Sequence, residues 1–159
     1  MLVEQGDPDN FENYWIGLER LHQLTKHGNY YLMTDMIAEN GTSYIEDYDS
    51  FIVQDSSTGY RMDVSGYFNG TTGSTTGSLS YHNGYGFSTR DAGDNQDCAA
   101  TYNSGWWYAG CNRNCYNCNN VLDKQLVMRP FDDPNDLVYL QSTWLQLRCK
   151  NSKILRDKI

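Results

Sequence analysis

The stretch from Tyr81 to Cys118 constrains the fold of this chain more than any other part of the sequence. It contains every cysteine except Cys149, a Trp pair at 106–107, and repeated Gly, Asn and Asp residues. Gly, Asn and Asp favour turns, and the aromatic residues follow no helical period, so a long helix is disfavoured here. The composition instead predicts an ordered, irregular loop region, which is the kind of segment that carries binding sites.

Composition narrows the class of protein. The 13 Tyr and 4 Trp residues supply large amphipathic rings, which predicts an aromatic rather than an aliphatic core. A length of 159 residues suits one domain. The net charge of -8, with no Lys/Arg cluster before residue 148, argues against nucleic acid as a partner. No apolar run is long enough to span a membrane, and no secretion leader is recognisable near Met1.

The residues before the loop region predict a short helix followed by antiparallel strands. Residues 19–25 have the apolar spacing of a helix that stops near Gly28, and His22 within it is interpreted as a structural histidine. Strands are expected at four places: 30–37, 42–48, 51–53 and 60–64. The Asn40-Gly41 pair predicts the hairpin turn between the first two strands. Residues 65–80 are rich in Gly, Ser and Thr and predict a loop.

The tail, residues 131–159, predicts a helix. Asp133-Pro134 is a good helix start, because Asp caps the first turn and Pro fits the first helical position. Four apolar residues would then share one face of an amphipathic helix: Leu137, Leu140, Trp144 and Leu147. The tail is slightly basic, whereas the rest of the chain is acidic. We therefore expect this helix to dock on the body of the protein, and docking on a partner is the alternative.

Two Asn-Gly-Thr sequons, at 40–42 and 69–71, match the acceptor pattern for N-glycosylation. They fit a secreted protein. Sequons are also common by chance, and ordinary turn residues explain both of them equally well. The sequence alone leaves both interpretations open.

Cys115 and Cys118 form a Cys-x-x-Cys pair, a pattern that zinc sites and redox sites use. With no second pair and no nearby His, a metal site is weakly indicated. An extra disulfide between the two, or a bridge from one of them to Cys149, is favoured instead. Catalysis finds no support, because no nucleophile stands at a recognisable spacing from the three His residues and no glycine-rich phosphate loop follows a strand. We expect a binding module and not an enzyme.

Several separated blocks agree in order and spacing with one known family. The earlier blocks are Tyr14–Leu18, Leu21–Thr25, Tyr48–Phe51 and Ser78–Gly84. The densest block comprises Phe87-Ser88-Thr89, Cys98-Ala99, Tyr102, Gly105-Trp106-Trp107-Tyr108 and Cys111. Together they resemble the fibrinogen-related domain, the C-terminal domain of fibrinogen chains that also occurs in ficolins, tachylectins, angiopoietins and tenascins. On this resemblance residues 12–130 form a partial fibrinogen-related domain, and residues 131–159 form a divergent tail with the amphipathic helix.

The resemblance implies an α+β domain, in which an antiparallel sheet with short helices accompanies an irregular, disulfide-stapled loop region. Relative to the family, the N-terminal subdomain and a C-terminal block with a central strand are missing. We therefore expect a sheet that is depleted, or one that residues 126–129 complete. After Asn117 the family has Gly where this chain has Cys118.

The resemblance also implies how the cysteines pair. Cys98 and Cys111 stand at the family's disulfide spacing, so we expect them to be bridged, with Cys149 as the odd cysteine. A disulfide indicates an oxidising compartment, and the family is extracellular. In the family the peptide bond before the second cysteine is often cis, which here would be Gly110–Cys111.

Two sites are implied by the same resemblance. Calcium would bind at Asp91 and Asp94, where Asp97, Asn95 and Gln96 add further oxygen atoms, and a solvated acidic turn is the alternative. The neighbouring ligand pocket would contain Tyr102, Trp107, Tyr108 and Asn112. Aromatic faces can stack on a sugar ring or an acetyl methyl group, while amide and hydroxyl groups supply hydrogen bonds.

The resemblance thus implies a secreted, lectin-like recognition module that binds carbohydrate or acetylated ligands beside a calcium loop, with a role in innate immunity. One alternative is a protein-protein interaction module for a receptor or an extracellular matrix partner. Asn112 favours it, because lectin-like members often have His at this place. Another is a truncated fragment without a function of its own. An oligomer would form through sequence not present in this chain.

Overall fold

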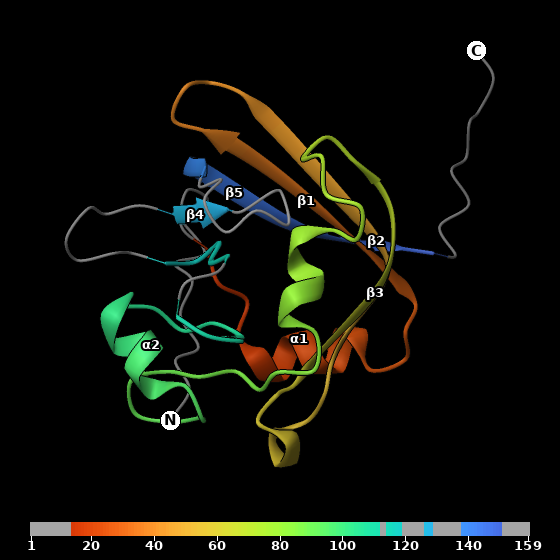
Figure 1. The fold of residues 1–159 in the computed structure, drawn as a ribbon. Coiled ribbons are helices and arrows are strands. Elements are labelled where there is room, and N and C mark those ends of the chain that lie inside the picture. Colours follow the sequence, from red (N-terminus) through yellow and green to blue (C-terminus); the bar gives the residue numbers. More distant parts are fainter. Residues whose placement is uncertain (1–13, 112–113, 119–125, 129–137, 151–159) are drawn as a thin grey trace.

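The computed structural model describes residues 14–111, 114–118, 126–128 and 138–150. Its elements, drawn in Figure 1, are α1 (Leu18–Thr25), β1 (Tyr30–Ala38), β2 (Ser43–Val53), η1 (Ser56–Thr58), β3 (Met62–Gly70), η2 (Ser78–His82), α2 (Gln96–Thr101), β4 (Leu126–Met128) and β5 (Val138–Cys149). The label η marks a 3-10 helix.

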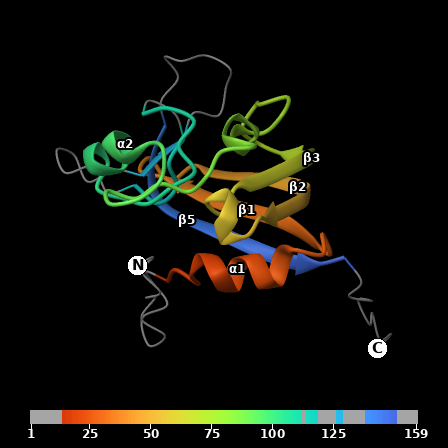
Figure 2. The ribbon, with the colours of Figure 1, turned by 90° about the horizontal axis from the view of Figure 1, so that it is seen from below.

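The strands of the described residues form one antiparallel sheet in the order β3-β2-β1-β5-β4. Along β1, buried residues alternate with partly exposed ones, because successive side chains of a strand point to opposite faces. Figure 2 shows α1 below the strands and α2 beside them, at the left. The predicted fold class, an α+β domain with an antiparallel sheet and short helices, is confirmed.

The helix α1 is attached to the end of β2. The backbone N–H of Val53 donates to Thr25 Oγ1 at 2.9 Å, and His22 Nδ1 lies 2.8 Å from the carbonyl oxygen of the same residue. Gly28 follows with φ of 67°, a left-handed conformation that lets the chain turn from the helix into β1. The predicted helix at 19–25 and the structural role of His22 are confirmed.

Several predicted boundaries were wrong by a few residues. The strands expected at 42–48 and 51–53 are one continuous strand, β2. The strand β3 runs to Gly70, so it includes the first part of the loop expected at 65–80. The helix α2 lies inside the region for which no helix was expected. It is only one to two turns long, and the helix-favouring pair Ala99-Ala100 lies at its centre.

The amphipathic helix predicted for the tail is wrong, because Val138–Cys149 is the strand β5. This strand pairs with β1 over nearly its whole length, from Tyr30 opposite Cys149 to Ala38 opposite Leu140. The backbone groups on the second edge of β1 need partners, and pairing with β5 satisfies them where a helix could not. The proposed helix start at Asp133-Pro134 lies outside the described residues.

β5 also changes what was expected of the sheet. Residues 126–129 were expected to complete it, and Leu126–Met128 do form a strand, β4, at its edge. The strand between β4 and β1, however, comes from the tail. Thr143 Oγ1 of β5 donates to the carbonyl oxygen of Tyr116 at 2.9 Å, which ties this strand to the loop region.

The core is aromatic, as predicted from composition. The largest fully buried side chains are Trp106, Trp107, Tyr48 and Tyr108. Their rings meet mainly edge to face: Phe87 and Trp107 lie 5.0 Å apart at 83°, and Phe51 and Trp107 lie 6.3 Å apart at 89°. Such contacts add to the free energy gained from burial of the ring area. The loop region thus packs its Trp pair against the sheet.

Candidate functional site

Two disulfides hold the loop region. Cys98, in α2, is bridged to Cys111 with a Cα–Cα distance of 4.8 Å, which confirms the predicted pairing. Cys115 and Cys118 form a second bridge with a Cα–Cα distance of 5.3 Å, one of the two alternatives left open by the sequence. Cys149 belongs to neither disulfide and lies exposed at the end of β5. The expected cis bond at Gly110–Cys111 is wrong, since this peptide is trans.

Trp107 lies in the core beneath the loop region. Its side chain is 1% exposed, and its indole N–H donates to the carbonyl oxygen of Tyr60 at 2.7 Å. Its own carbonyl oxygen lies 2.8 Å from Nδ1 of the buried His82. A ring enclosed in this way presents no face to solvent, so the structure gives Trp107 a supporting position behind the surface.

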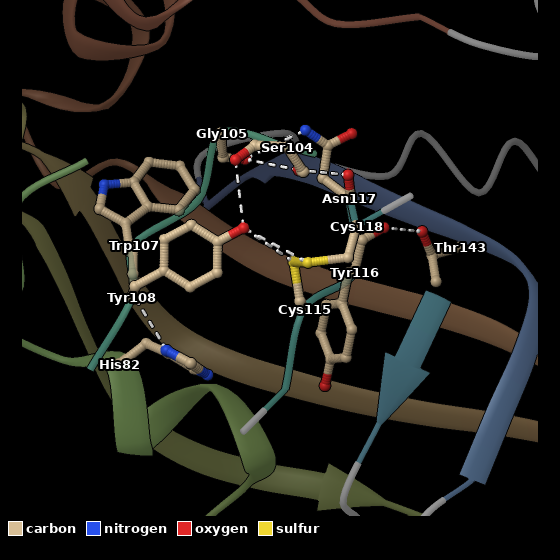
Figure 3. Close-up of a disulfide and its surroundings, with 10 residues drawn as sticks. All are labelled: His82, Ser104, Gly105, Trp107, Tyr108, Cys115, Tyr116, Asn117, Cys118 and Thr143. Atoms are coloured by element: carbon tan, nitrogen blue, oxygen red, sulfur yellow. Dashed lines mark hydrogen bonds between the residues drawn. A yellow bond between two sulfur atoms is a disulfide. The ribbon is translucent and has the colours of Figure 1, made fainter. Parts of the chain in front are cut away.

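Tyr108 is also enclosed, at 1% exposed, beside the second disulfide (Figure 3). Its hydroxyl donates to the carbonyl oxygen of Ser104 at 3.1 Å and lies 3.4 Å from Sγ of Cys118 and 3.8 Å from Sγ of Cys115. Burial raises the pKa of Tyr108 well above its ordinary value, so the phenol is neutral at physiological pH.

Tyr102 is the member of the predicted pocket that reaches the surface. It follows α2, its side chain is half-buried, and its ring stacks on that of Tyr108 with centroids 6.2 Å apart and planes at 20°. One face of Tyr102 is thus supported from inside by a fixed ring. The structure brings Tyr102 and Tyr108 together, whereas Asn112 lies outside the described residues.

The acidic loop follows the Phe87-Ser88-Thr89 block. The side chains of Asp91, Asp94 and Asp97 are exposed, and a short bridge between Thr89 and Ala92 closes the turn that contains Asp91. Thr89 Oγ1 donates to Asp91 Oδ1 at 2.8 Å, and this hydrogen bond lowers the pKa of the Asp91 carboxyl.

This loop offers part of a calcium ligand set. In the described part of the chain, no three acidic, His or Cys side chains are placed together to hold a metal. Two carboxyl groups on a short exposed loop can still share a calcium ion with backbone carbonyls and water. The loop has oxygen-bearing side chains of the kind that calcium binds, and among the described residues they form no preformed cage.

Asn95 links the acidic loop to the aromatic pair, a role that the sequence did not reveal. Its side-chain Nδ2 donates to the carbonyl oxygen of Tyr108 at 2.8 Å, and its backbone N–H donates to Ser88 Oγ at 3.1 Å. Gly93 makes this close approach feasible, because its φ is 89° and a Cβ there would lie 2.5 Å from Ser88 Oγ. One side chain thus joins the acidic loop to the backbone of Tyr108.

Behind the site lies a buried polar network centred on Glu46 of β2. Glu46 is fully buried, and its carboxyl oxygens accept from Tyr48 Oη at 2.7 Å and from Thr72 Oγ1 at 2.7 Å. The backbone N–H and the hydroxyl of Ser78 donate to the same group at 2.9 Å and 2.5 Å.

Tyr116, on the turn closed by the second disulfide, extends this network through a hydrogen bond between its hydroxyl and Ser78 Oγ. Burial raises the pKa values of Tyr48 and Tyr116 above their ordinary range. The network joins the sheet, η2 and the second disulfide. Its sequence signal was the alternation of Tyr44, Glu46 and Tyr48, which places an acidic residue on the same strand face as two Tyr residues.

The sequence matches the family described as "Fibrinogen beta and gamma chains, C-terminal globular domain" over residues 4–147. This match covers most of the chain, including all but the last two residues of β5. The protein therefore belongs to the fibrinogen C-terminal domain family, and the resemblance found in its sequence is confirmed.

Curated relatives include a tenascin and a ficolin. The chain is 41% identical to Tenascin of Gallus gallus over 111 residues, which is 68% of this chain and 6% of the relative. It is 36% identical to Ficolin-3 of Homo sapiens over 107 residues, which is 65% of this chain and 35% of the relative. The chain thus spans only a small part of the tenascin and about a third of the ficolin.

Solved structures agree on the fold. The fibrinogen-like globe domain of human ANGPTL6 superposes with a TM-score of 0.73 at 28% identity, covering 91% of this chain and 67% of that one. The corresponding domain of human ANGPTL2 gives 0.71 at 27% identity, covering 92% and 69%. A lamprey fibrin D-dimer, complexed with a Gly-His-Arg-Pro-amide peptide, gives 0.64 at 23% identity over 86% and 50%, a likeness of fold alone. Among the helices described, none is long and apolar enough to cross a membrane.

Proposed function

We propose that this domain is an extracellular recognition module that binds a carbohydrate or acetylated ligand at the surface of Tyr102. The stacked Tyr102–Tyr108 pair carries the proposal. The ring of Tyr102 is half-buried and that of Tyr108 is buried; Asn95 holds the backbone carbonyl of Tyr108, and the Cys98–Cys111 disulfide brackets the segment that contains both residues. Such a rigid aromatic face loses little conformational entropy when a ligand binds.

The chemistry of the pair suits a ligand with one apolar and one polar side. The exposed face of Tyr102 would pack against an acetyl methyl group or the C–H face of a sugar ring, while its hydroxyl and Asn112 would hydrogen-bond the polar edge. Tyr108 belongs to this site as the ring that supports Tyr102, and Trp107 lies in the core beneath the loop region. The function is binding and not catalysis, and a role in innate immunity fits the relation to ficolin-3.

Replacing Tyr102 by Ala is expected to weaken binding to an immobilised N-acetylated sugar about tenfold or more, which corresponds to roughly 1.4 kcal/mol. Tyr102→Phe keeps the ring and should lose less. Tyr85→Ala is the matched control, since Tyr85 is a surface Tyr of the same loop region that is 42% exposed. Binding would be measured by surface plasmon resonance. Equal affinity of the wild type and Tyr102→Ala would exclude this site.

The relation to tenascin favours a second candidate, a protein-protein interaction module that uses the same surface for a receptor or matrix protein. Identity to the tenascin is 41%, against 36% to the ficolin. Two results together would support this candidate. The protein would bind no sugar on a glycan array, and it would bind a purified extracellular protein in a way that depends on Tyr102.

We further propose that calcium binds the acidic loop through Asp91 and Asp94. When bound, the ion would offset the charge of the two carboxyl groups and order the loop beside Asn95. The exposed positions of both side chains, three residues apart on the acidic loop, support this proposal.

Calcium at a hundredfold excess over its Kd is expected to stabilise the folded protein by about 2.7 kcal/mol. The gain should appear as a rise in Tm in differential scanning calorimetry and should be absent from Asp91→Asn and Asp94→Asn. Asp49→Asn removes an exposed carboxylate from β2, outside the acidic loop, and serves as the control that keeps the response. A calcium response that persists in both variants would contradict the assignment.

A further inference from the structure

The two Asn-Gly-Thr sequons have different structural settings. In the first, Asn40 and Gly41 form the tight turn between β1 and β2, and all three residues are exposed. Asn40 Oδ1 accepts from the backbone N–H of Thr42 at 2.9 Å, which is a local turn contact. No residue in the described ranges hydrogen-bonds to Asn40 Nδ2 or to the hydroxyl of Thr42. Figure 1 shows the hairpin turn at the end of the sheet opposite α1.

The second sequon is also exposed, but there the same two groups are used by the fold. Asn69 Nδ2 donates to Asp47 Oδ2 at 2.8 Å. Asp47 is only 5% exposed, and its other carboxyl oxygen has no hydrogen-bond partner among the described residues. Thr71 Oγ1 accepts from the backbone N–H of Ile45 at 3.1 Å and so satisfies a donor of β2.

This contrast distinguishes the two interpretations that the sequence left open for each sequon, namely a glycosylation acceptor or ordinary structural residues. At 69–71 the fold itself needs the amide of Asn and the hydroxyl of Thr, because each satisfies a group of β2. At 40–42 the turn needs Asn and Gly, whose φ is 83°, but it has no use for the hydroxyl of Thr42. That hydroxyl is the feature that turns Asn40 into an N-glycosylation acceptor.

We propose that Asn40 carries an N-linked glycan and that Asn69 does not. The co-substrate is a lipid pyrophosphate-linked oligosaccharide. Asn40 Nδ2 forms a bond to C1 of the first sugar, and the bond from C1 to the pyrophosphate oxygen breaks. The electron pair leaves with the lipid pyrophosphate, and the amide nitrogen loses one proton to solvent.

The surroundings of the two asparagines support this selectivity. A sugar on Asn40 extends from a surface turn into solvent and displaces no hydrogen bond of the described residues. A sugar on Asn69 Nδ2 must fit against Asp47, where the amide now satisfies a buried carboxyl group. The two disulfides are consistent with passage through the oxidising compartment in which such transfer takes place.

The test uses the whole chain, directed into the secretory pathway of a eukaryotic cell by an added leader. The secreted protein is treated with a peptide-N-glycanase in heavy-oxygen water, which converts a glycosylated Asn into a labelled Asp, and its peptides are mapped by mass spectrometry. The expected result is one label that appears only when the enzyme is added, at residue 40, and the loss of one glycan from the intact mass; a sample without the enzyme records the spontaneous deamidation of Asn-Gly pairs.

Variants give an independent check. Thr42→Ala should abolish the mass loss, whereas Thr42→Ser should keep it, because Ser also completes the acceptor pattern. Both changes are at an exposed residue whose hydroxyl the fold does not use, and unchanged circular dichroism would verify folding. The wild-type peptide map decides the question even if a variant misfolds. Absence of the label at residue 40, or a label at residue 69, overturns the proposal.

Discussion

Replacing Glu46 by Ala is expected to lower the free energy of unfolding by roughly 3 to 5 kcal/mol, because it leaves several buried donors without their acceptor. Tyr48 Oη, Thr72 Oγ1 and the backbone N–H of Ser78 all donate to this one carboxyl group. The loss would be measured by urea denaturation followed by tryptophan fluorescence, which reports directly on the buried Trp pair.

Asp49→Ala is the matched control for Glu46. Asp49 lies on the same strand, but its side chain is 59% exposed and its ion pair with Lys150 is long, at 3.7 Å. Exposed ion pairs contribute little, so this change should cost less than about 1 kcal/mol. Glu46→Gln keeps one acceptor oxygen and should fall between the two. If Glu46→Ala unfolded at the same urea concentration as Asp49→Ala, the network would not stabilise the fold.

Removal of the Cys98–Cys111 bridge is expected to cost roughly 3 kcal/mol of stability, because the unfolded chain regains the entropy of a closed loop. The double change Cys98→Ser and Cys111→Ser should also weaken ligand binding, since the bridge holds the segment that runs from α2 through Tyr102 to Tyr108. Urea denaturation and surface plasmon resonance on the same samples would report the two effects.

Cys149→Ser is the control for this experiment, because Cys149 is exposed and lies outside both disulfides. Neither stability nor binding should change in it. If the double variant kept its stability, the bridge would be structurally dispensable. If the double variant lost stability but kept full affinity for the ligand at a temperature where it remains folded, the ligand site at Tyr102 would not depend on the Cys98–Cys111 disulfide.

The helix and strands in the first half of the fold could be predicted from the sequence because the patterns that indicate them are local. The helix α1, the hairpin of β1 and β2, and the turn at Asn40-Gly41 follow from short patterns that neighbouring residues satisfy. The tail was misread because its apolar spacing also fits a helix, and the deciding contact is remote. Gln146 of β5 bonds to Asp35 of β1 across a sequence separation of 111 residues, which no local pattern records.

The candidate site was only partly predictable for a similar reason. The short motifs shared with the family pointed to Tyr102 and to the disulfide. Such motifs indicate which residues lie in one region, but they do not indicate which aromatic ring is exposed to solvent. Trp107 is enclosed because Tyr60 accepts its N–H from a distant turn. Asn95 and Glu46 were missed because their partners are a backbone carbonyl and a set of hydroxyl groups that only the folded chain assembles.

Because β5 pairs with β1 but comes near the end of the chain, the sheet can be completed only late in synthesis. On the ribosome, β1 and β2 are synthesised early and can pair at once, but the other edge of β1 stays open until the residues of β5 emerge. An open strand edge with apolar neighbours invites pairing with other chains. High contact order also slows folding. The edge of β1 that β5 covers is therefore the last part of the sheet to be paired as the chain is made.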